Sequence, residues 1–203
     1  MSFRIIQVAL LSLAVLGVCV SGFTSSTSFH HSSRSSLSMS TSTTAAEVKV
    51  GDTLPDVTLT EGLPDFDKQT MTLLELIKGK KVAIFAVPGA FTPGCSKSHL
   101  PSFITAKDDL KAKGVDMILC IATNDAYVME AWGRTSGGAE AGIRFLSDGS
   151  AELTRALGLA MESDTMVRSK RYSLIAEDGV VTHYFSSAEQ SSDTWAPNVL
   201  ASL

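Results

Sequence analysis

The chain has 203 residues, three cysteines and a formal net charge of -4, and 44% of its residues are hydrophobic. This length favours one domain of ordinary size with room for a removable leader. The hydrophobic content is sufficient for a globular core and too high for a disordered chain. Lys and Arg are scattered along the sequence, so nothing in the charge pattern indicates a nucleic-acid-binding protein.

The first 22 residues have the pattern of a secretory signal peptide. Arg4 precedes an apolar run over residues 5–20, which ends in the small residues Ser21 and Gly22. A charged start, a short apolar stretch and a small-residue exit are typical of such peptides. A signal-anchor helix is the alternative, although the run is short for a bilayer span of about 20 residues. No second run of spanning length follows, so we expect no membrane segment in the mature form.

The next segment, residues 23–46, has the composition of an organelle transit peptide. In residues 24–44, 15 of 21 positions are Ser or Thr, the only charge is Arg34, and the first acidic residue of the chain is Glu47. A Ser-rich stretch without acidic residues is typical of transit peptides. A disordered linker or an O-glycosylated stalk has a similar composition. The junction before Phe23 resembles two-part leaders that carry a protein to the secretory membrane and then into a plastid.

The cysteine count separates a plastid protein from a secreted one. Without residues 1–46, the chain keeps Cys95 and Cys120 in 157 residues (203 − 46), which is no disulfide framework. Loss of the two leader arginines leaves 15 basic and 21 acidic residues, a mature charge of -6. We therefore predict a signal peptide (1–22), a disordered transit segment (23–46) and a mature domain (47–203) in the plastid stroma, with the secretory pathway as the alternative.

Short apolar runs and helical patterns alternate along the mature part. Strands are predicted where such runs are rich in β-branched residues and end at Gly, Pro or Asp, at residues 81–87, 115–122, 172–176 and 180–185. The Asp178-Gly179 pair between the last two runs is a hairpin signal. Helices are predicted by apolar spacing and by end signals such as Gly114, at residues 97–113, 125–134, 151–157 and 197–203. This alternation indicates an α/β domain with helices on both faces of a sheet.

The most informative segment surrounds Cys95, where a predicted buried strand ends at Pro88 and a loop leads into a helix. A thiol in the first turn of a helix faces unpaired backbone N–H groups and the positive end of the helix dipole, and both favour the thiolate. The thiolate is the reactive form of cysteine. An inert core cysteine is the general alternative, because free cysteines are among the most buried residues. The flanking prolines and glycines favour a loop at the surface.

Pro88, Thr92 and Cys95 form the pattern P-x-x-x-T-x-x-C, which matches the active-site signature of peroxiredoxins. The wider string PGAFTPGCSKSHLP resembles the type II group of that family. The resemblance extends over almost the whole mature chain and includes Lys170-Arg171-Tyr172. It implies a thioredoxin-like α/β fold, with a central mixed sheet flanked by helices, and no metal or organic cofactor.

The resemblance implies a thiol-dependent peroxidase that reduces hydrogen peroxide and organic hydroperoxides. The Cys95 thiolate would attack one peroxide oxygen, release water or an alcohol and become a sulfenic acid. Thr92 would offer its hydroxyl to the sulfur and to the attacked oxygen, and N-capping of the helix is a compatible role. Arg171 would hold the thiolate and polarise the peroxide. Pro88 would shield the sulfur from water and fix the loop.

His99 lies four residues after Cys95 and therefore on the same face of the helix. A Cys–His hydrolase and a metal site are alternatives for such a pair. However, two residues on one helix leave a poor position for a base with its own orienting partner, and structural zinc takes four ligands. We therefore expect His99 to make a local polar contact.

The sequence departs from the animal type II pattern at the resolving cysteine. Animal members carry that cysteine just before a C-terminal Ala-Pro-Asn, where residues 191–195 of this chain contain no thiol. Cys120, 25 positions after Cys95 (120 − 95), is the remaining candidate, and its spacing resembles the plant type II arrangement with an intramolecular disulfide. Core packing is the alternative for Cys120, because a thiol in an apolar strand stays protonated and a disulfide needs Cα atoms within about 7 Å.

The resemblance also implies partners. These are a hydroperoxide as substrate, thioredoxin, glutaredoxin or glutathione as reductant, and a second copy of the chain in a weak homodimer through the surface near the active site. A second function uses the same Cys95 environment: a peroxide-responsive redox sensor, or thiol-relay binding module, that passes its disulfide to a partner without multiple turnover.

Overall fold

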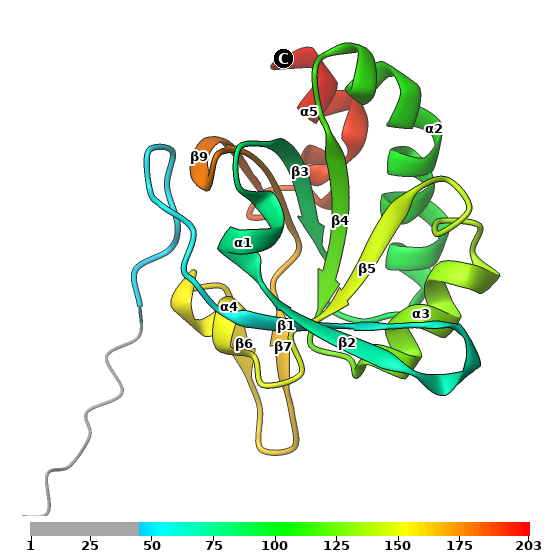
Figure 1. Cartoon of the computed structure of the whole chain (residues 1–203). Helices are drawn as coiled ribbons and strands as arrows, with labels where there is room; N and C mark the ends of the chain where they lie inside the picture. Colours follow the sequence, from blue (N-terminus) through cyan, green and yellow to red (C-terminus); the bar gives the residue numbers. More distant parts are fainter. Residues whose placement is uncertain (1–44) are drawn as a thin grey trace, which may run out of the picture. The chain divides into compact units, whose positions relative to one another are not determined.

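A mixed sheet of seven strands, in the order β2-β1-β5-β4-β3-β8-β9, forms the centre of the fold (Figure 1). The computed structural model describes residues 45–203. The predicted signal peptide (1–22) and all but the last two residues of the predicted transit segment (23–46) lie outside the described residues. None of the helices within residues 45–203 is long and apolar enough to cross a membrane.

Parallel strands occupy the middle of the sheet and antiparallel strands its two sides. The parallel strands are β3 (Lys81–Ala86), β4 (Met117–Ala122) and β5 (Ile143–Ser147). The antiparallel strands are β1 (Thr58–Gly62), β2 (Lys68–Thr72), β8 (Tyr172–Glu177) and β9 (Val180–Ser186). A separate hairpin consists of β6 (Ala160–Glu162) and β7 (Val167–Ser169). The predicted central mixed sheet flanked by helices is confirmed.

Within residues 45–203, five α-helices and three helical turns of 3-10 or π type accompany the strands. The α-helices are α1 (Leu73–Ile77), α2 (Leu100–Ala112), α3 (Ala126–Thr135), α4 (Glu152–Ala156) and α5 (Ala196–Ala201). The helical turns are η1 (Pro64–Phe66), η2 (Cys95–His99) and η3 (Ser191–Thr194). The four predicted helices correspond to α2, α3, α4 and α5, each shifted by a few residues at its ends.

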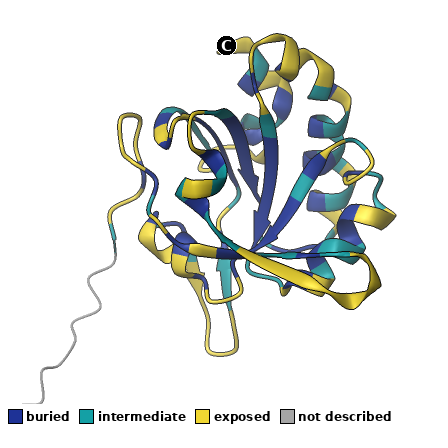
Figure 2. Ribbon diagram, in the orientation of Figure 1, coloured by how far each residue is buried: buried dark blue, intermediate teal, exposed yellow. Residues whose placement is uncertain are grey.

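The core has two halves, one on each face of the sheet, because side chains of a strand alternate between faces. In β3, Ala83 and Phe85 pack on one face, whereas Val82 and Ile84 pack on the other. Helices α2, α3 and α5 contribute to the first half, and α1 and α4 to the second. The central strands are accordingly buried along most of their length (Figure 2). The expectation of helices on both faces is confirmed.

The sequence patterns did not predict β1, β2, β5 or α1. Strands β1 and β2 read TLTEG and KQTMT, and both are partly exposed. They lie at one side of the sheet, where half of the residues face water, so no continuous apolar run marks them. Strand β5 is well buried but short, and its five residues contain Arg144. The Arg144 guanidinium pairs with Glu61 on the neighbouring strand β1, a partner that is 83 residues away in sequence.

Candidate active site

The helix that carries Cys95 begins at Pro93, directly after the loop that leaves β3, and its first part is widened. Residues 95–99 form a π-helical turn, in which the Leu100 N–H donates to the Cys95 carbonyl. Pro101 explains the widening, because it has no N–H for the Lys97 carbonyl and its ring displaces that group. Such π-helical turns are uncommon and often occur at functional sites.

The Cys95 sulfur lies beside a guanidinium. Arg171 Nη2 is 3.2 Å from Sγ, a hydrogen bond between residues 76 positions apart. The first hydrogen bond of the helix runs from the Ser96 N–H to the Thr92 carbonyl (2.9 Å), so the N–H groups of Gly94 and Cys95 precede it at the positive end of the helix. Cys95 has 0% exposed surface, although Gly94 next to it is exposed. The structure thus brings together the predicted pair of Cys95 and Arg171.

A buried histidine holds the other side of the same guanidinium. Arg171 Nη1 is 2.9 Å from His99 Nδ1, and because arginine only donates, Nδ1 is the acceptor. The hydrogen of His99 therefore sits on Nε2, which donates to the Thr194 carbonyl at 3.0 Å. Burial, reinforced by the charge of Arg171, lowers the pKa of His99 to about 3. The imidazole is thus neutral near neutral pH.

The expected local contact of His99 is replaced by long-range ones. Its partners Arg171, Ser173 and Thr194 lie 72 to 95 residues further along the chain. Its ring also packs edge-on against Phe85, with centroids 5.1 Å apart. The spacing from Cys95 placed His99 on the correct face of the helix, but it contains no information on what packs against that face.

The loop between β3 and the helix is held by three contacts on consecutive residues. The Pro88 carbonyl accepts from Arg168 Nη1 (2.9 Å), the Gly89 carbonyl accepts from the Thr92 hydroxyl (2.8 Å), and the Ala90 N–H donates to Asn124 Oδ1 (2.9 Å). The hydrogen of the Thr92 hydroxyl goes to Gly89, and the expected role of this hydroxyl towards the sulfur and the attacked oxygen stays a prediction. Arg168 and Asn124 were not among the predicted site residues.

Cys120 lies in the middle of β4, between Phe85 of β3 and Phe145 of β5. It is fully buried in the same half of the core as Cys95, and both thiols are free. Burial, and secondarily the charge of Cys95, raises the pKa of the Cys120 thiol well above its usual value. Cys120 therefore remains a protonated thiol in this conformation, on the face of the sheet that α2 covers.

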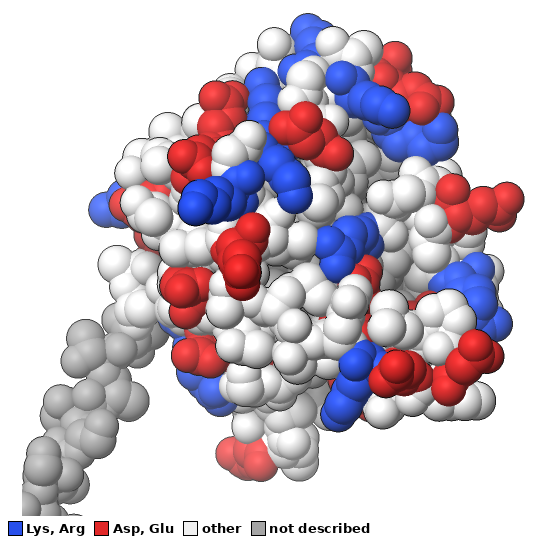
Figure 3. All heavy atoms as spheres, in the orientation of Figure 1, with Lys and Arg blue, Asp and Glu red and all other residues white. Residues whose placement is uncertain are grey.

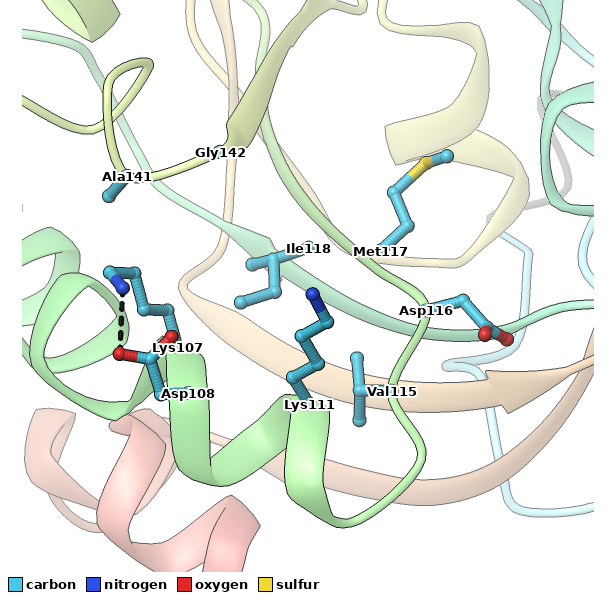
Figure 4. A pocket seen from close by; sticks show the side chains of 9 residues that line it. All are labelled: Lys107, Asp108, Lys111, Val115, Asp116, Met117, Ile118, Ala141 and Gly142. Atoms are coloured by element: carbon cyan, nitrogen blue, oxygen red, sulfur yellow. Dashed lines mark hydrogen bonds and ion pairs between the residues drawn. The ribbon is translucent and has the colours of Figure 1, made fainter.

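Away from the Cys95 loop, the surface has a hollow at the other end of the sheet and charges of both signs. A hollow of about 330 Å³ lies at the opposite, amino ends of β4 and β5, and is lined by Lys107, Asp108, Lys111, Val115, Asp116, Met117, Ile118, Ala141 and Gly142 (Figure 4). There Lys107 is paired with the adjacent Asp108 at 2.8 Å. On the face of residues 45–203 drawn in Figure 3, charges of both signs are interspersed. Within the same residues, no three His, Cys, Asp or Glu side chains are grouped to hold a metal ion.

Comparison with known proteins identifies the family. The profile of the family described as Redoxin matches residues 49–200. The chain is 53% identical over 146 residues to "Peroxiredoxin-2E-2, chloroplastic" of Oryza sativa subsp. japonica, and 44% identical over 140 residues to "Peroxiredoxin-2B" of Arabidopsis thaliana. These matches cover 69% and 68% of this chain. The chain belongs to the peroxiredoxin family.

The matches differ in how much of each peroxiredoxin they span. They cover 86% of the Arabidopsis protein but 65% of the longer rice protein. The structure of reduced Prx3 from Vibrio vulnificus, in complex with hydrogen peroxide, superposes with a TM-score of 0.71. It is 45% identical, and the match covers 76% of this chain and 98% of that one. The thioredoxin-like fold that the resemblance to peroxiredoxins implies is thus confirmed.

Proposed function

We propose that this peroxiredoxin is a thiol-dependent peroxidase that reduces hydrogen peroxide and organic hydroperoxides through Cys95. The observation that carries the proposal is the 3.2 Å contact between Arg171 Nη2 and the Cys95 sulfur at the start of a helix. A guanidinium at this distance stabilises negative charge on the sulfur and on the oxygen that leaves. The peroxide bound to the related Vibrio vulnificus protein supports a peroxide as the substrate.

In the proposed step, the Cys95 thiolate attacks the oxygen of R–O–O–H that carries the hydrogen. A sulfur–oxygen bond forms, the oxygen–oxygen bond breaks, and its electron pair leaves on RO⁻, which takes a proton and departs as ROH. Cys95 becomes a sulfenic acid. The Thr92 hydroxyl donates its one hydrogen to Gly89, so towards the peroxide it acts as an acceptor. Pro88 begins the loop that shields the sulfur.

Access to the sulfur requires a small opening. Cys95 has no exposed surface, but Phe91 of the loop and Pro93 and Gly94 at the start of the helix are exposed. Phe91 also has a left-handed backbone (φ 60), which is unfavourable for a residue with a side chain. We infer that this loop moves to admit the peroxide.

Replacement of Arg171 by Met tests whether the contact between its guanidinium and the Cys95 sulfur speeds the reaction with peroxide. The variant loses the charge beside the sulfur, so we expect the second-order rate with hydrogen peroxide to fall by a factor of about 10² to 10³, as when an enzyme loses one donor to a developing oxyanion. The measurement is stopped-flow tryptophan fluorescence, because the Trp132 indole donates to Ser96 beside Cys95 (3.1 Å). Arg134→Met, which removes an exposed arginine on α3, is the control. Wild-type reactivity in Arg171→Met would refute the assignment.

We further infer that Cys120 resolves the sulfenic acid. Its thiol would attack the Cys95 sulfur, form a disulfide and release water, after which thioredoxin, glutaredoxin or glutathione would restore both thiols by exchange. Placement of both cysteines in the same half of the core supports this pairing. Because Cys120 is buried and protonated, the start of the Cys95 helix has to unwind first.

Intact-mass measurement of the full chain carrying Cys19→Ser tests the disulfide. One equivalent of peroxide is expected to remove two hydrogens, whereas the additional change Cys120→Ser should leave a product with one added oxygen. The same oxidised product and turnover with and without Cys120 would show that it only packs in the core. Repeated peroxide consumption with a reductant supports the peroxidase, and oxidation that stops after one equivalent would favour the sensor.

Two further proposals concern assembly and location. A weak homodimer near the site is supported by exposed apolar side chains beside the loop, among them Phe91 (56% exposed) and Met166 (49%). Sedimentation at rising concentration is expected to show dimers that Phe91→Ser weakens.

Location in the plastid stroma is supported by the name of the rice relative and by the predicted leader. A fluorescent protein fused to residues 1–46 should accumulate there rather than be secreted.

A further inference from the structure

A second arginine of the same segment contacts the Cys95 loop at its other end. Arg168 lies in β7, three residues before Arg171, and its Nη1 donates to the Pro88 carbonyl at 2.9 Å. Arg171 reaches the end of the loop at Cys95. The two side chains therefore touch the loop where it leaves β3 and where it enters the helix.

Gly89 shows how closely the guanidinium of Arg168 lies on the loop. A Cβ atom at Gly89 would be 2.5 Å from Arg168 Nη1 and 3.3 Å from the methyl carbon of Thr92. Gly89 is not among the residues with a left-handed backbone, so its conformation would accept a side chain. A side chain at Gly89 would therefore have to displace the guanidinium, which is the far end of the Arg168 side chain.

The contact of Arg168 holds the peptide group next to the one that the Thr92 hydroxyl binds. Arg168 donates to the carbonyl of the Pro88–Gly89 peptide. In the adjoining Gly89–Ala90 peptide, the N–H donates to Asn124, and the Gly89 carbonyl takes the hydrogen of the Thr92 hydroxyl (2.8 Å). This second contact decides which way the lone pairs of the hydroxyl point. Arg168 Nε is in turn held by the sulfur of Met166 at 3.1 Å. Within residues 45–203, Arg168 is in no ion pair. Its guanidinium is therefore available to donate to the Pro88 carbonyl.

We propose that Arg168 is a positioning residue of the peroxidase site, which fixes the Pro88–Gly89 peptide and, through the adjoining Gly89–Ala90 peptide, the acceptor face of the Thr92 hydroxyl. This inference rests on the proposed peroxidase function. It assigns separate roles to the two arginines. Arg171 stabilises negative charge on the sulfur, whereas Arg168 sets the orientation of the Thr92 hydroxyl that accepts from the peroxide.

The separation of roles is testable with Arg168→Met, compared with Arg171→Met and with the surface control Arg134→Met. A misplacement of about 1 Å at a reacting group costs up to about 10²-fold in rate, so we expect Arg168→Met to slow the reaction with hydrogen peroxide by about 10- to 100-fold. The thiolate fraction at neutral pH, read from ultraviolet absorbance, should stay as in the wild type. In Arg171→Met, by contrast, the rate with hydrogen peroxide and the thiolate fraction should both fall. Arg168→Lys should recover part of the rate, because an ammonium can still donate to the Pro88 carbonyl.

A double-mutant cycle with Gly89 gives a readout that a general loss of stability does not produce. Gly89→Ala should slow the peroxide reaction when Arg168 is present, because the new methyl group displaces the guanidinium. In the Arg168→Ala background the same change should have a smaller effect, so the two effects should not add. This cycle also serves if Arg168→Met fails to fold.

The outcomes separate this inference from the function on which it rests. A wild-type protein that does not react with peroxide would contradict the peroxidase itself. A reactive wild type with Arg168→Met within twofold of its rate, or with additive effects of Gly89→Ala and Arg168→Ala, would overturn the role of Arg168 alone. Equal loss of thiolate in Arg168→Met and Arg171→Met would also overturn it, because Arg168 would then act on the sulfur.

Discussion

At the scale of single residues, the neutral state of His99 explains how Arg171 remains available to the sulfur. Within the described part of the chain, Arg171 is in no ion pair, and its hydrogen-bond partners are Cys95 and His99. A carboxylate at the place of His99 would compete with the thiolate for the guanidinium charge. A neutral imidazole orients the guanidinium without neutralising it.

The buried imidazole predicts a pH dependence of stability. The pKa of His99 is lowered to about 3 in the folded protein, whereas an unfolded histidine takes up a proton near pH 6.5. Below that pH the unfolded state binds the additional proton, so the contribution of His99 to folding falls as the pH decreases from about 6.5 towards 3. At pH 5 this amounts to about 2 kcal/mol.

Urea unfolding at pH 7 and pH 5 measures this effect. The free energy of unfolding of the wild type should drop between the two pH values by about 2 kcal/mol more than that of His99→Asn, because Asn does not titrate. Asn was chosen because its side-chain oxygen can take the place of Nδ1 as acceptor for Arg171. An equal drop in both proteins would show that His99 is protonated in the native state.

At the scale of elements, the helix α3 supports the Cys95 turn from the side. Its Trp132 indole donates to the Ser96 hydroxyl at 3.1 Å. The helix is capped by Asp125, whose carboxylate accepts from the N–H groups of Tyr127 (2.8 Å) and Val128 (2.9 Å). The same strand-to-helix connection contains Asn124, which holds the Ala90 N–H of the Cys95 loop. The cap therefore stabilises an element with two contacts to the site.

Loss of this cap should destabilise the protein. Asp125→Ala leaves two N–H groups without their acceptor, and substitution of such a cap by Ala costs about 1 kcal/mol. Chemical denaturation measures the difference from wild type. The matched control is Asp108→Ala, because Asp108 is an exposed carboxylate of α2 that pairs with its neighbour Lys107. Its loss should stay within about 0.5 kcal/mol. Equal effects of both changes would contradict a capping role of Asp125.

At the scale of the whole molecule, the first described residues are attached to the domain. The Val48 side chain is buried, and its N–H donates to the Leu157 carbonyl at 2.9 Å. The Glu47 carboxylate accepts from Tyr184 (2.7 Å) and Lys170 (3.0 Å), and these two hydrogen bonds lower its pKa. These contacts tie residues 47 and 48 to the domain, and a mature chain that begins at Glu47 stays a prediction.

Two shortened chains test this boundary. A chain that starts at Val50 lacks the buried Val48 side chain, so we expect it to be less stable than a chain that starts at Glu47 by about 2 kcal/mol. Glu47→Gln in the longer chain should cost less than about 1 kcal/mol, because its ion pair with Lys170 is nearly half exposed. Equal unfolding midpoints of the two chains would place the functional boundary after Val48.

The sequence by itself predicted Cys95 as the nucleophile, the buried strands β3, β4 and β8, and the helices of the site. These depend on local order: an apolar run such as residues 81–87 can only be buried, and a Pro- and Gly-rich loop before Cys95 can only connect it to the next element. The same holds for the Asp178-Gly179 hairpin, where both residues have a positive φ (48 and 82). The family signature added Arg171, which periodicity alone does not distinguish from a surface charge.

The tertiary structure alone decided what surrounds the sulfur. His99 meets Arg171 across 72 residues, and Arg168 meets Pro88 across 80. Such contacts depend on the order of the strands in the sheet, which places β8 beside β3. Residue periodicity reports which face of an element is buried, but not which distant side chain lies opposite it. For this reason Cys95 and Arg171 could be predicted from the sequence, whereas the contacts of His99 and Arg168 that orient the surroundings of the sulfur could not.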